Sequence, residues 1–378
     1  MLREIPKDYA RSIRILILNW RDVKNPSSGG AEILTQEMAK RWVKLGHEVT
    51  QFSSSFKGSK KEEVIDGVKL IRRGRWWSVH ILAFFYYFKN FRTKADAVID
   101  EVHWFPFFAL LYARQKVILL VCEVATDLFS SFFPLSLSII FKIFEKTYLR
   151  LYKNVPTLAI SASTKNDLIK KGFSENSITI LPMGVSVPKN INILPKEKNK
   201  TLVYVGRLTK LKGIGDAMLV LKLIRRELPE TKLWIIGRGE AHYVKKLKDG
   251  AKYLGIIDSV IFYDFVSEEK KFSLMSRAHI LLVPSAHEGW GLIVHEAGIV
   301  GTPAVVYNVE GLRDVVKDGE NGILVRQNPR AMANKVKELL LNKDLYAEIK
   351  QQAMSHAKKM NWDNTANKGL RIIKKLSQ

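Results

Sequence analysis

The sequence has little cysteine and few acidic residues. Cys122 is the one cysteine in 378 residues, which excludes an internal disulfide and any metal site built from several cysteines and is typical of a reducing compartment. Only 37 Asp and Glu stand against 61 Lys and Arg, so the net charge is +24. Such an excess favours anionic partners: phosphorylated small molecules, nucleic acid or an acidic lipid surface.

Long hydrophobic runs are also missing. The longest, residues 128–144, is interrupted by serines, Pro134 and Lys142, whereas a membrane-spanning helix needs about 20 apolar residues. The N-terminal segment mixes acids and bases with one short apolar run, unlike an export signal. We therefore expect a cytoplasmic protein that can lie on the inner face of the cell membrane without crossing it.

What the sequence does have is a regular alternation of strand-like and helix-like segments. Apolar runs such as IRILIL (13–18) and KVILLV (116–121) alternate with amphipathic stretches, which predicts an α/β protein with mostly parallel sheets. The alternation stops in a polar segment, residues 187–200, and then starts again. We expect two doubly wound, Rossmann-like domains, 1–188 and 189–361.

Glycines and bases follow the predicted strands, where open α/β sheets bind their ligands. One segment reads GRLTKLKG, with Arg207 and Lys212 beside the start of a predicted helix. Helix N–H groups flanked by an Arg and a Lys favour a diphosphate. A single glycine of this kind indicates only a tight turn, and bases in a basic protein are more often simply solvated.

A pair of acids is more specific. The segment HEGWGLIVHE (287–296) places Glu288 after a strand and Glu296 on the following helix. Two such carboxylates can accept hydrogen bonds from two sets of hydroxyls, as on a sugar and on a ribose, while the glycines between them let backbone N–H groups reach an anion. In the alternative interpretation Glu296 is a surface helix residue and Glu288 flanks a helix.

Together these segments resemble retaining glycosyltransferases of family four, which have the GT-B fold of two Rossmann-like domains facing a central cleft. The resemblance covers nearly the whole chain and is carried by WRDVKNPSSGGAE (20–32), SASTKNDL (161–168), GRLTKLKG (206–213), IIGRGE (235–240) and, most specifically, EGWGLIVHE (288–296) with GTPAVV (301–306). It implies transfer of a hexosyl unit from a nucleotide-diphosphate sugar to an acceptor hydroxyl. The first domain would bind the acceptor, the second the donor, and a last helix, about 362–378, would cross back onto the first.

The resemblance also implies roles for individual residues. Arg207 and Lys212 would bind the donor diphosphate and stabilise the leaving group, Glu288 would hold hydroxyls of the donor sugar, and Glu296 the ribose. The other implied donor-binding residues are Gly29, Gly30, Gly206, Gly237, Arg238, Phe265, Val266, Gly291, Leu292 and Ile293. No D-x-D motif occurs, so we expect no metal and no cofactor, only a UDP- or GDP-linked sugar as co-substrate.

One position departs from the family. Many relatives have a histidine where KVILLVCEVATD has Cys122 and Glu123. In those relatives the histidine contacts the sugar, and this chain lacks it. His103, after the preceding predicted strand, could enter the acceptor side with Trp104 and Glu123. A lone histidine beside aromatic residues is more often simply packed.

An aromatic and basic segment points to a membrane surface. Residues 69–92, KLIRRGRWWSVHILAFFYYFKNFR, contain six bases and no acid, a composition that suits anionic lipid. We expect membrane contact and a lipid-linked acceptor, with the contact made by Arg72, Arg73, Arg75, Trp76 and Trp77. A second stretch, 140–153, carries bases on one stripe, and we expect it to be an ordinary helix whose apolar side covers the sheet. The residues roughly opposite the bases are Ile140, Phe144, Tyr148 and Leu151.

Three other functions stay open at this point. The basic and aromatic stretches could grip nucleic acid, but Glu288 and Glu296 would repel a phosphate backbone. A nucleotide-sugar epimerase or a phosphorylase could share the fold, although no pyridoxal lysine site is recognisable. The sequence does not distinguish UDP-glucose, UDP-N-acetylglucosamine and GDP-mannose as donors.

Overall fold

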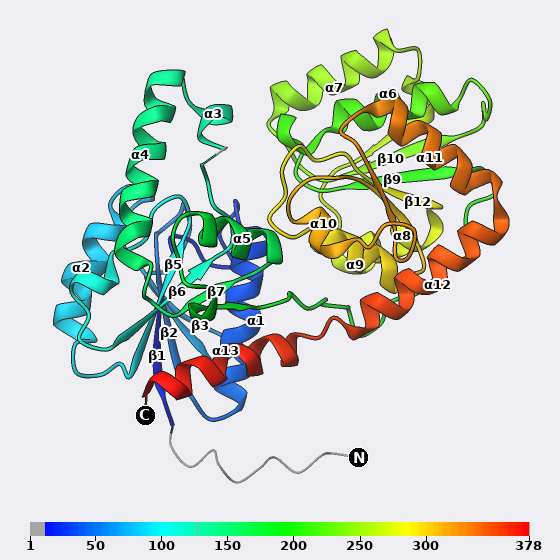
Figure 1. Cartoon of the computed structure of the whole chain (residues 1–378). Helices are drawn as coiled ribbons and strands as arrows, with labels where there is room; N and C mark the ends of the chain where they lie inside the picture. Colours follow the sequence, from blue (N-terminus) through cyan, green and yellow to red (C-terminus); the bar gives the residue numbers. More distant parts are fainter. Residues whose placement is uncertain (1–11, 127, 378) are drawn as a thin grey trace, which may run out of the picture. The chain divides into compact units, whose positions relative to one another are not determined.

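The computed structural model describes residues 12–126 and 128–377, which form two compact units (Figure 1). Unit 1 contains the described residues up to Met183 and those from Trp362 onward, and unit 2 is Gly184–Asn361. The sequence places the boundary slightly later, after residue 188. Most of the segment on which the export prediction rests, residues 1–11, lies outside the described residues. Each unit is an α/β fold with one sheet, and the two Rossmann-like domains are confirmed.

The sheet of unit 1 has eight strands in the order β3-β4-β2-β1-β5-β6-β7-β8. Every neighbouring pair is parallel except β3 and β4, which form an antiparallel hairpin at one edge. The strands are β1 Arg14–Leu18, β2 Glu48–Ser53, β3 Glu62–Ile65, β4 Val68–Arg72, β5 Ala97–Val102, β6 Lys116–Val121, β7 Thr157–Ala159 and β8 Ile178–Ile180. All six residues of β5 are buried, as expected for a central parallel strand covered on both faces.

Helices cover this sheet on both faces. They are α1 Gly30–Lys44, α2 Val79–Asn90, α3 Phe129–Phe132, α4 Leu135–Tyr152, α5 Ala162–Lys170, α13 Trp362–Ser377 and the short 3₁₀ turns η1 Ala109–Leu111 and η2 Glu175–Ser177. The inner sides of α2 and α4 pack into the same hydrophobic cluster, through residues such as Tyr87 and Tyr152. Their outer sides therefore face away from the same side of the sheet.

The last helix, α13, returns to unit 1 and packs on α1 (Figure 1). The indole of the buried Trp42 on α1 donates to the carbonyl of Ala366 (2.8 Å), and Thr365 Oγ1 donates to the carbonyl of Pro182 (2.5 Å). Arg41 pairs with Asp363. A segment far away in the sequence thus completes the first sheet's helical layer.

Unit 2 is built around a six-stranded parallel sheet in the order β11-β10-β9-β12-β13-β14. Its strands are β9 Thr201–Val205, β10 Lys232–Ile236, β11 Val260–Tyr263, β12 Ile280–Val283, β13 Ala304–Tyr307 and β14 Ile323–Val325. Its helices are α6 Ile214–Ile224, α7 Ala241–Tyr253, α8 Glu268–Arg277, α9 Leu292–Ile299, α10 Leu312–Val315, α11 Pro329–Leu341 and α12 Lys343–Lys359, with 3₁₀ turns η3 Lys210–Lys212 and η4 Ile257–Ser259. In the described part of the chain, no helix combines the length and the apolar composition needed to cross a membrane.

Candidate donor site and acceptor-side residues

The strand order of unit 2 reverses between β9 and β12. From β9 the chain continues to β10 and β11 on one side, and from β12 to β13 and β14 on the other. In open parallel sheets the loops separate at such a reversal, and ligands bind there at the carboxyl ends of the strands. Arg207 and Lys212 follow β9, and Glu288 and Gly291 follow β12. The fold therefore brings these predicted residues to one edge of one sheet.

Close backbone packing holds the loops of this edge together. Gly213 has φ +69°, and a Cβ there would lie 1.9 Å from the carbonyl oxygen of Pro284, after β12. Gly237, after β10, has φ +146°, and a Cβ there would lie 1.9 Å from the carbonyl oxygen of Gly206. The backbone N–H of Ala286 donates to Leu211 (2.8 Å). Only glycine permits these approaches, which explains the glycines after β9 and β10.

Lys212 and Glu288 form an ion pair at this edge. Lys212 Nζ lies 2.5 Å from Glu288 Oε2, and both side chains are about one-fifth exposed, at 21% and 20%. Arg207, on the same loop as Lys212, is exposed, and the Tyr204 hydroxyl fixes this loop by donating to the carbonyl of Arg207 (3.0 Å). Burial raises the pKa of Tyr204 well above its usual value, so its hydroxyl stays a donor. The edge thus presents an ion pair, Lys212 with Glu288, and a second cation, Arg207, on the loop that carries Lys212.

Helix α9 begins at the same place. Gly291 precedes it with φ +89°, and a Cβ at that position would approach Leu312 Cδ2 to 2.7 Å. No side chain caps the helix, so N–H groups of its first turn, which starts with Leu292 and Ile293, are available to a ligand. The N-terminus of a helix favours an anion.

Glu296, on α9, is held by a residue that the sequence analysis missed. Lys271 Nζ on α8 lies 2.8 Å from Glu296 Oε2 and 2.7 Å from Glu268, and only 16% of the Glu296 side chain is exposed. Burial raises the pKa of Glu296 against the opposing effect of Lys271. Burial alone would lower the pKa of Lys271, but its two carboxylates outweigh it and the net shift is upward. No sequence pattern pairs these residues, because they lie on separate helices.

An exposed aromatic ring lies on a neighbouring loop. Phe265, between β11 and α8, is 65% exposed, and the Arg238 guanidinium lies over its ring at 4.5 Å. Val266, next to it, is half-buried. Arg238 follows β10, so these residues extend the same edge of the sheet beyond Gly237.

The predicted donor residues Gly29 and Gly30 belong to unit 1. Gly29 caps α1, and its N–H donates to Glu32 Oε2 (2.6 Å). The structure therefore does not bring these two glycines into the same unit as the other predicted donor residues.

The acceptor-side residues also lie in unit 1, near the ends of β5 and β6. His103 Nε2 lies 2.9 Å from Glu101 Oε1, and Trp104 has the unusual φ of +67°. Cys122 is buried and Glu123 half-buried. Glu101 is a second residue that the sequence analysis did not single out.

The predicted membrane contacts need a correction. Arg72 is 1% exposed and lies at the end of β4, where Asp22 (2.6 Å) and Glu63 (2.9 Å) bind its guanidinium. Composition alone predicts one continuous surface segment, but its first residues form the strand β4, and Arg72 at the end of that strand is buried. Arg73 is half-buried and pairs with Glu62.

The remaining predicted contacts are on the surface. Arg75 is exposed, and the side chains of Trp76 and Trp77 are 68% and 60% exposed. They lie just before α2, whose outer side also exposes Ile81, Phe85 and Phe88.

Helix α4 corrects part of the expectation that it covers the sheet with its apolar side: Tyr148 is buried as expected, but other apolar residues are not. Its buried residues include Glu145 and Tyr148, whereas Ile140, Ile143 and Phe144 are 58%, 61% and 41% exposed. Glu145 is buried because its carboxylate accepts from the backbone N–H of Ala125 (2.7 Å) and binds the Thr126 hydroxyl. The inner side of the helix thus combines this polar anchor with core residues such as Tyr148 and Tyr152, while other apolar side chains are left outside.

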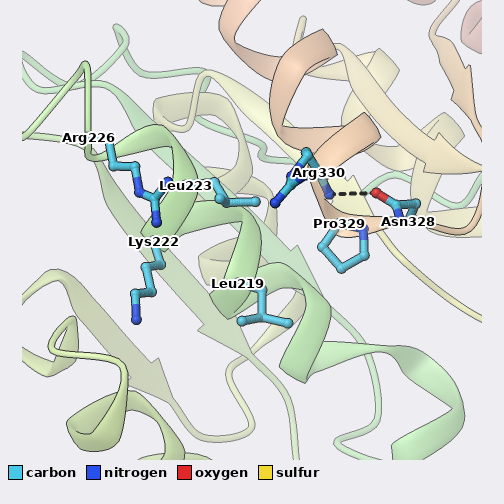
Figure 2. A pocket seen from close by; sticks show the side chains of 7 residues that line it. All are labelled: Leu219, Lys222, Leu223, Arg226, Asn328, Pro329 and Arg330. Carbon is cyan, nitrogen blue, oxygen red and sulfur yellow. Dashed lines mark hydrogen bonds between the residues drawn. The ribbon is translucent and has the colours of Figure 1, made fainter.

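A hollow of about 380 Å³ lies elsewhere on unit 2, between α6 and α11 (Figure 2). It is lined by Leu219, Lys222, Leu223, Arg226, Asn328, Pro329 and Arg330, none of which the sequence predicted as a site residue. The side chain of Asn328 caps α11 by accepting from the N–H of Arg330 (2.9 Å). Within residues 12–126 and 128–377, no three His, Cys, Asp or Glu side chains are grouped to hold a metal ion.

Two family models match the chain, one after the other. Residues 28–188 match the model "Glycosyltransferase Family 4", and residues 187–356 match "Glycosyl transferases group 1". Similar curated proteins include an uncharacterized glycosyltransferase of Methanocaldococcus jannaschii, 29% identical over 60% of this chain and 62% of that protein. Another is a D-inositol 3-phosphate glycosyltransferase of Corynebacterium urealyticum, 30% identical over 47% of this chain and 43% of that protein. The matches span less than two thirds of these relatives' own lengths.

Solved structures resemble the chain over almost its whole length. Sucrose-phosphate synthase from Thermosynechococcus elongatus gives a TM-score of 0.79 at 17% identity, covering 96% of this chain and 99% of that one. Anabaena HepE in complex with UDP and glucose gives 0.73 at 17% identity, covering 96% and 100%. WaaG, a glycosyltransferase of lipopolysaccharide biosynthesis, gives 0.74 at 17% identity, covering 95% and 99%. At these identities the likeness is one of fold.

Proposed function

Because the chain belongs to glycosyltransferase family 4 and has the GT-B fold, we propose that it transfers a hexosyl unit from a nucleotide-diphosphate sugar to an acceptor hydroxyl with retention of configuration. The observation that carries the proposal is the Lys212–Glu288 ion pair, with Arg207 on the same loop as Lys212, where the strand order of unit 2 reverses. Two cations suit a diphosphate, and a carboxylate suits sugar hydroxyls.

The donor would be bound by groups of unit 2 with complementary chemistry. Arg207, Lys212 and the first N–H groups of α9 bind the diphosphate. Glu288 accepts hydrogen bonds from hydroxyls of the hexose. Glu296, held by Lys271, accepts them from the ribose.

The exposed ring of Phe265 gives the nucleobase a flat apolar surface beside Arg238. Stacking on an aromatic ring tolerates either uracil or guanine, because every base has a π-face. The UDP and glucose bound to Anabaena HepE favour a UDP-linked hexose for this chain also.

During transfer the bond between the anomeric carbon and the diphosphate oxygen breaks, and a bond to the acceptor oxygen forms on the same face. The acceptor's proton passes to the departing phosphate oxygen, so no side chain has to act as a covalent nucleophile. Arg207 and Lys212 stabilise the negative charge that grows on the diphosphate. These fixed cations would let the reaction proceed without a metal.

A nucleotide screen tests the donor part of the proposal. UDP, GDP and their hexose derivatives are added to the protein, and the thermal midpoint and the release of nucleotide are measured. One nucleotide series should raise the midpoint, since a ligand that binds only the folded state stabilises it. If neither series stabilises the protein nor is turned over, the proposal is wrong.

We propose further that unit 1 lies on an anionic membrane and that the acceptor is lipid-linked. The outer sides of α2 and α4 face away from the same side of the sheet and expose large apolar residues, among them Phe85 (63%) and Ile143 (61%). Bases including Arg75, Lys89 and Lys146 accompany them. Apolar side chains that enter the lipid boundary, with cations at the headgroups, are the features of a peripheral membrane surface.

Vesicle sedimentation tests this surface. The protein should bind vesicles with anionic headgroups at low salt, and Trp76→Ser with Trp77→Ser should weaken binding about tenfold or more, because two exposed indoles are lost. Tyr253→Ser is the matched control, since Tyr253 is 91% exposed on α7 of unit 2. Equal binding by the double variant and the control would contradict the proposal.

A further inference from the structure

The strand order of unit 1 also reverses, between β1 and β5. From β1 the chain moves to β2 on one side, and the later strands β5 to β8 follow on the other. The rule that ligands bind beside such a reversal therefore selects the carboxyl ends of β1 and β5. The residues found there are Trp20 and Arg21 after β1, and Glu101 and His103 at the end of β5.

Glu101 is a fully buried carboxylate whose oxygens both have partners. It is 0% exposed. Its Oε2 accepts from Asn19 Nδ2 (2.6 Å) and from Thr35 Oγ1 (2.6 Å), and its Oε1 lies 2.9 Å from His103 Nε2. Donors from β1 and α1 thus fix the carboxylate in one orientation, which in turn fixes the imidazole.

This arrangement sets which nitrogen of His103 is open. An ionised carboxylate can only accept hydrogen bonds, so Nε2 carries the proton, and in the neutral ring Nδ1 keeps its lone pair. Nδ1 has no hydrogen-bond partner among the described residues, and 12% of the side chain is exposed. Trp20 stacks on the ring with centroids 5.6 Å apart. The imidazole is therefore held rigidly, with one acceptor atom unused.

The loop after His103 is held in a strained conformation. Trp104 and Phe108 have φ of +67° and +56°, values that non-glycine residues rarely adopt. The buried carboxylate of Asp100 accepts from the N–H groups of Phe107 (2.7 Å) and Ala109 (2.9 Å), and the carbonyl of Trp104 accepts from the Tyr148 hydroxyl (2.9 Å). Strain that is held by several specific bonds is typical of functional sites.

The charges around His103 favour a neutral ligand group. Glu101 faces it with negative charge, Glu32 and Arg21 neutralise each other (2.9 Å), and burial raises the pKa of Cys122, which stays uncharged. His80, the other titratable neighbour, has its pKa lowered by burial. Burial lowers the pKa of His103 itself, but Glu101 outweighs this and the net shift is upward. A phosphate would be repelled by the carboxylate of Glu101, whereas a neutral hydroxyl would not be.

We propose that Glu101 and His103 form the acceptor-recognition group of unit 1, in which His103 Nδ1 accepts a hydrogen bond from a neutral sugar hydroxyl. The inference deepens the proposed function and rests on it, because it takes the acceptor to be a glycoside. His103 binds the acceptor, and Glu101 is a positioning residue that acts through it.

Nitrogen NMR of histidine-labelled protein tests the inference without any turnover. At a pH above the raised pKa of His103 the ring is neutral, and wild type should show the Nε2–H tautomer, assigned with His103→Asn. Methyl glucoside, galactoside and mannoside are then titrated separately, with inorganic phosphate as the anionic arm. At least one glycoside should shift the Nδ1 signal of His103 while phosphate does not.

His47 is the internal control, because it is buried at the opposite end of the sheet, where its Nδ1 accepts from Ile13 N–H (3.2 Å). A shift with phosphate, or with no glycoside, overturns the inference.

Glu101→Gln supplies a second readout. A glutamine amide can donate to Nε2, which moves the ring proton to Nδ1, so the tautomer should switch and the glycoside response should be lost. A merely structural role for Glu101 would leave the tautomer unchanged. Should this variant fail to fold, the wild-type titration decides alone.

Kinetics separate this inference from the proposed function. With the nucleotide sugar that the donor screen selects and the glycoside that shifts His103, His103→Asn should raise the KM for glycoside ~10- to 100-fold, the range for one lost hydrogen bond, and leave the KM for donor within about twofold. An unchanged KM for glycoside contradicts the inference alone. A wild-type protein that binds no nucleotide contradicts the proposed function, while the NMR result still decides on His103.

Discussion

At the scale of single residues, the feature with the clearest consequence is the contact between Lys212 and Glu288. Each side chain neutralises the other at 2.5 Å, and the two come from loops separated by more than seventy positions. Their spacing along the chain gives no sign of the contact, although the sequence did single out each of them. Residues such as Lys271 and Glu101 escaped because their importance lies in a partner that only the fold supplies.

Removing either member of this pair should abolish most of the activity. Lys212→Ala and Glu288→Ala are each expected to lower kcat by ~10²- to 10³-fold, the usual effect of losing one group that stabilises charge in the transition state. Far-UV circular dichroism should show both variants folded. Lys335→Ala is the control, because Lys335 also pairs with a carboxylate, Glu338, but on the exposed side of α11. Normal turnover in either site variant would contradict the assigned roles.

A buried histidine gives unit 2 a sensitivity to acid. Burial, with a contribution from His356, lowers the pKa of His295 to about 3, and its Nε2 has no hydrogen-bond partner in the described part of the chain. Below the unfolded pKa of about 6.5 the unfolded chain takes up a proton that the folded protein refuses. The free energy of unfolding should therefore fall as the pH falls, by up to about 1.4 kcal/mol per pH unit for this group.

Urea unfolding at pH 7, 6 and 5 measures this slope. His295→Leu should flatten it, whereas His242→Leu should not, because the His242 side chain is 77% exposed. Identical slopes for wild type and His295→Leu would show that this histidine does not carry the effect.

At the scale of elements, the loops of the donor site depend on glycines that admit no side chain. Gly237→Ala would place a Cβ 1.9 Å from the Gly206 carbonyl oxygen at a φ of +146°, so strain and overpacking together should cost about 2–4 kcal/mol of stability. Nucleotide binding should weaken as well, since Arg207 follows Gly206 directly.

The control for this substitution is another glycine of unit 2. Gly215→Ala lies within α6 and meets no atom within 4 Å, so it should stabilise the protein by up to about 1 kcal/mol through helix propensity. Chemical denaturation of both variants gives the comparison. If the two variants are equally stable, the backbone around residue 237 shifts enough to accept a Cβ, and the predicted strain is absent.

The sequence predicted some helices and strands much better than others. Buried strands such as β6 and β9 were predictable, because continuous β-branched and aliphatic runs have few alternatives. Helix α4 was not, since its apolar residues occupy a helical stripe that could equally well face the core or the solvent. The buried Glu145, bound to the backbone of Ala125, decided the orientation, and no pattern in the sequence reveals such a bond.

At the scale of the whole molecule, the two α/β units follow from the interruption of the strand and helix rhythm near residue 190. The placement of Arg72 did not follow, because a basic side chain at the end of a strand is buried only when acids from other segments, here Asp22 and Glu63, reach it. Local composition predicts surface character well and long-range pairing poorly.

Deleting the last helix tests the dependence of unit 1 on a distant segment. A chain ending at Asn361 loses α13 and uncovers Trp42, whose side chain is 0% exposed in the intact protein. Unit 1 should unfold at a lower temperature, while the donor site of unit 2 should still bind nucleotide. A thermal scan measures the unfolding temperature of unit 1, and a nucleotide titration on the same sample measures binding by unit 2. Loss of nucleotide binding together with unit 1 stability would contradict independent folding of unit 2.

The return of α13 has a consequence for biosynthesis. A ribosome releases the strands of unit 1 first, then all of unit 2, and only afterwards the segment from Trp362. The nascent amino-terminal sheet must therefore wait, with the indole of Trp42 and its neighbours on α1 uncovered, until unit 2 and the segment from Trp362 have been synthesised. During that interval the unfinished sheet is a natural target for chaperones, and premature termination would leave it permanently open.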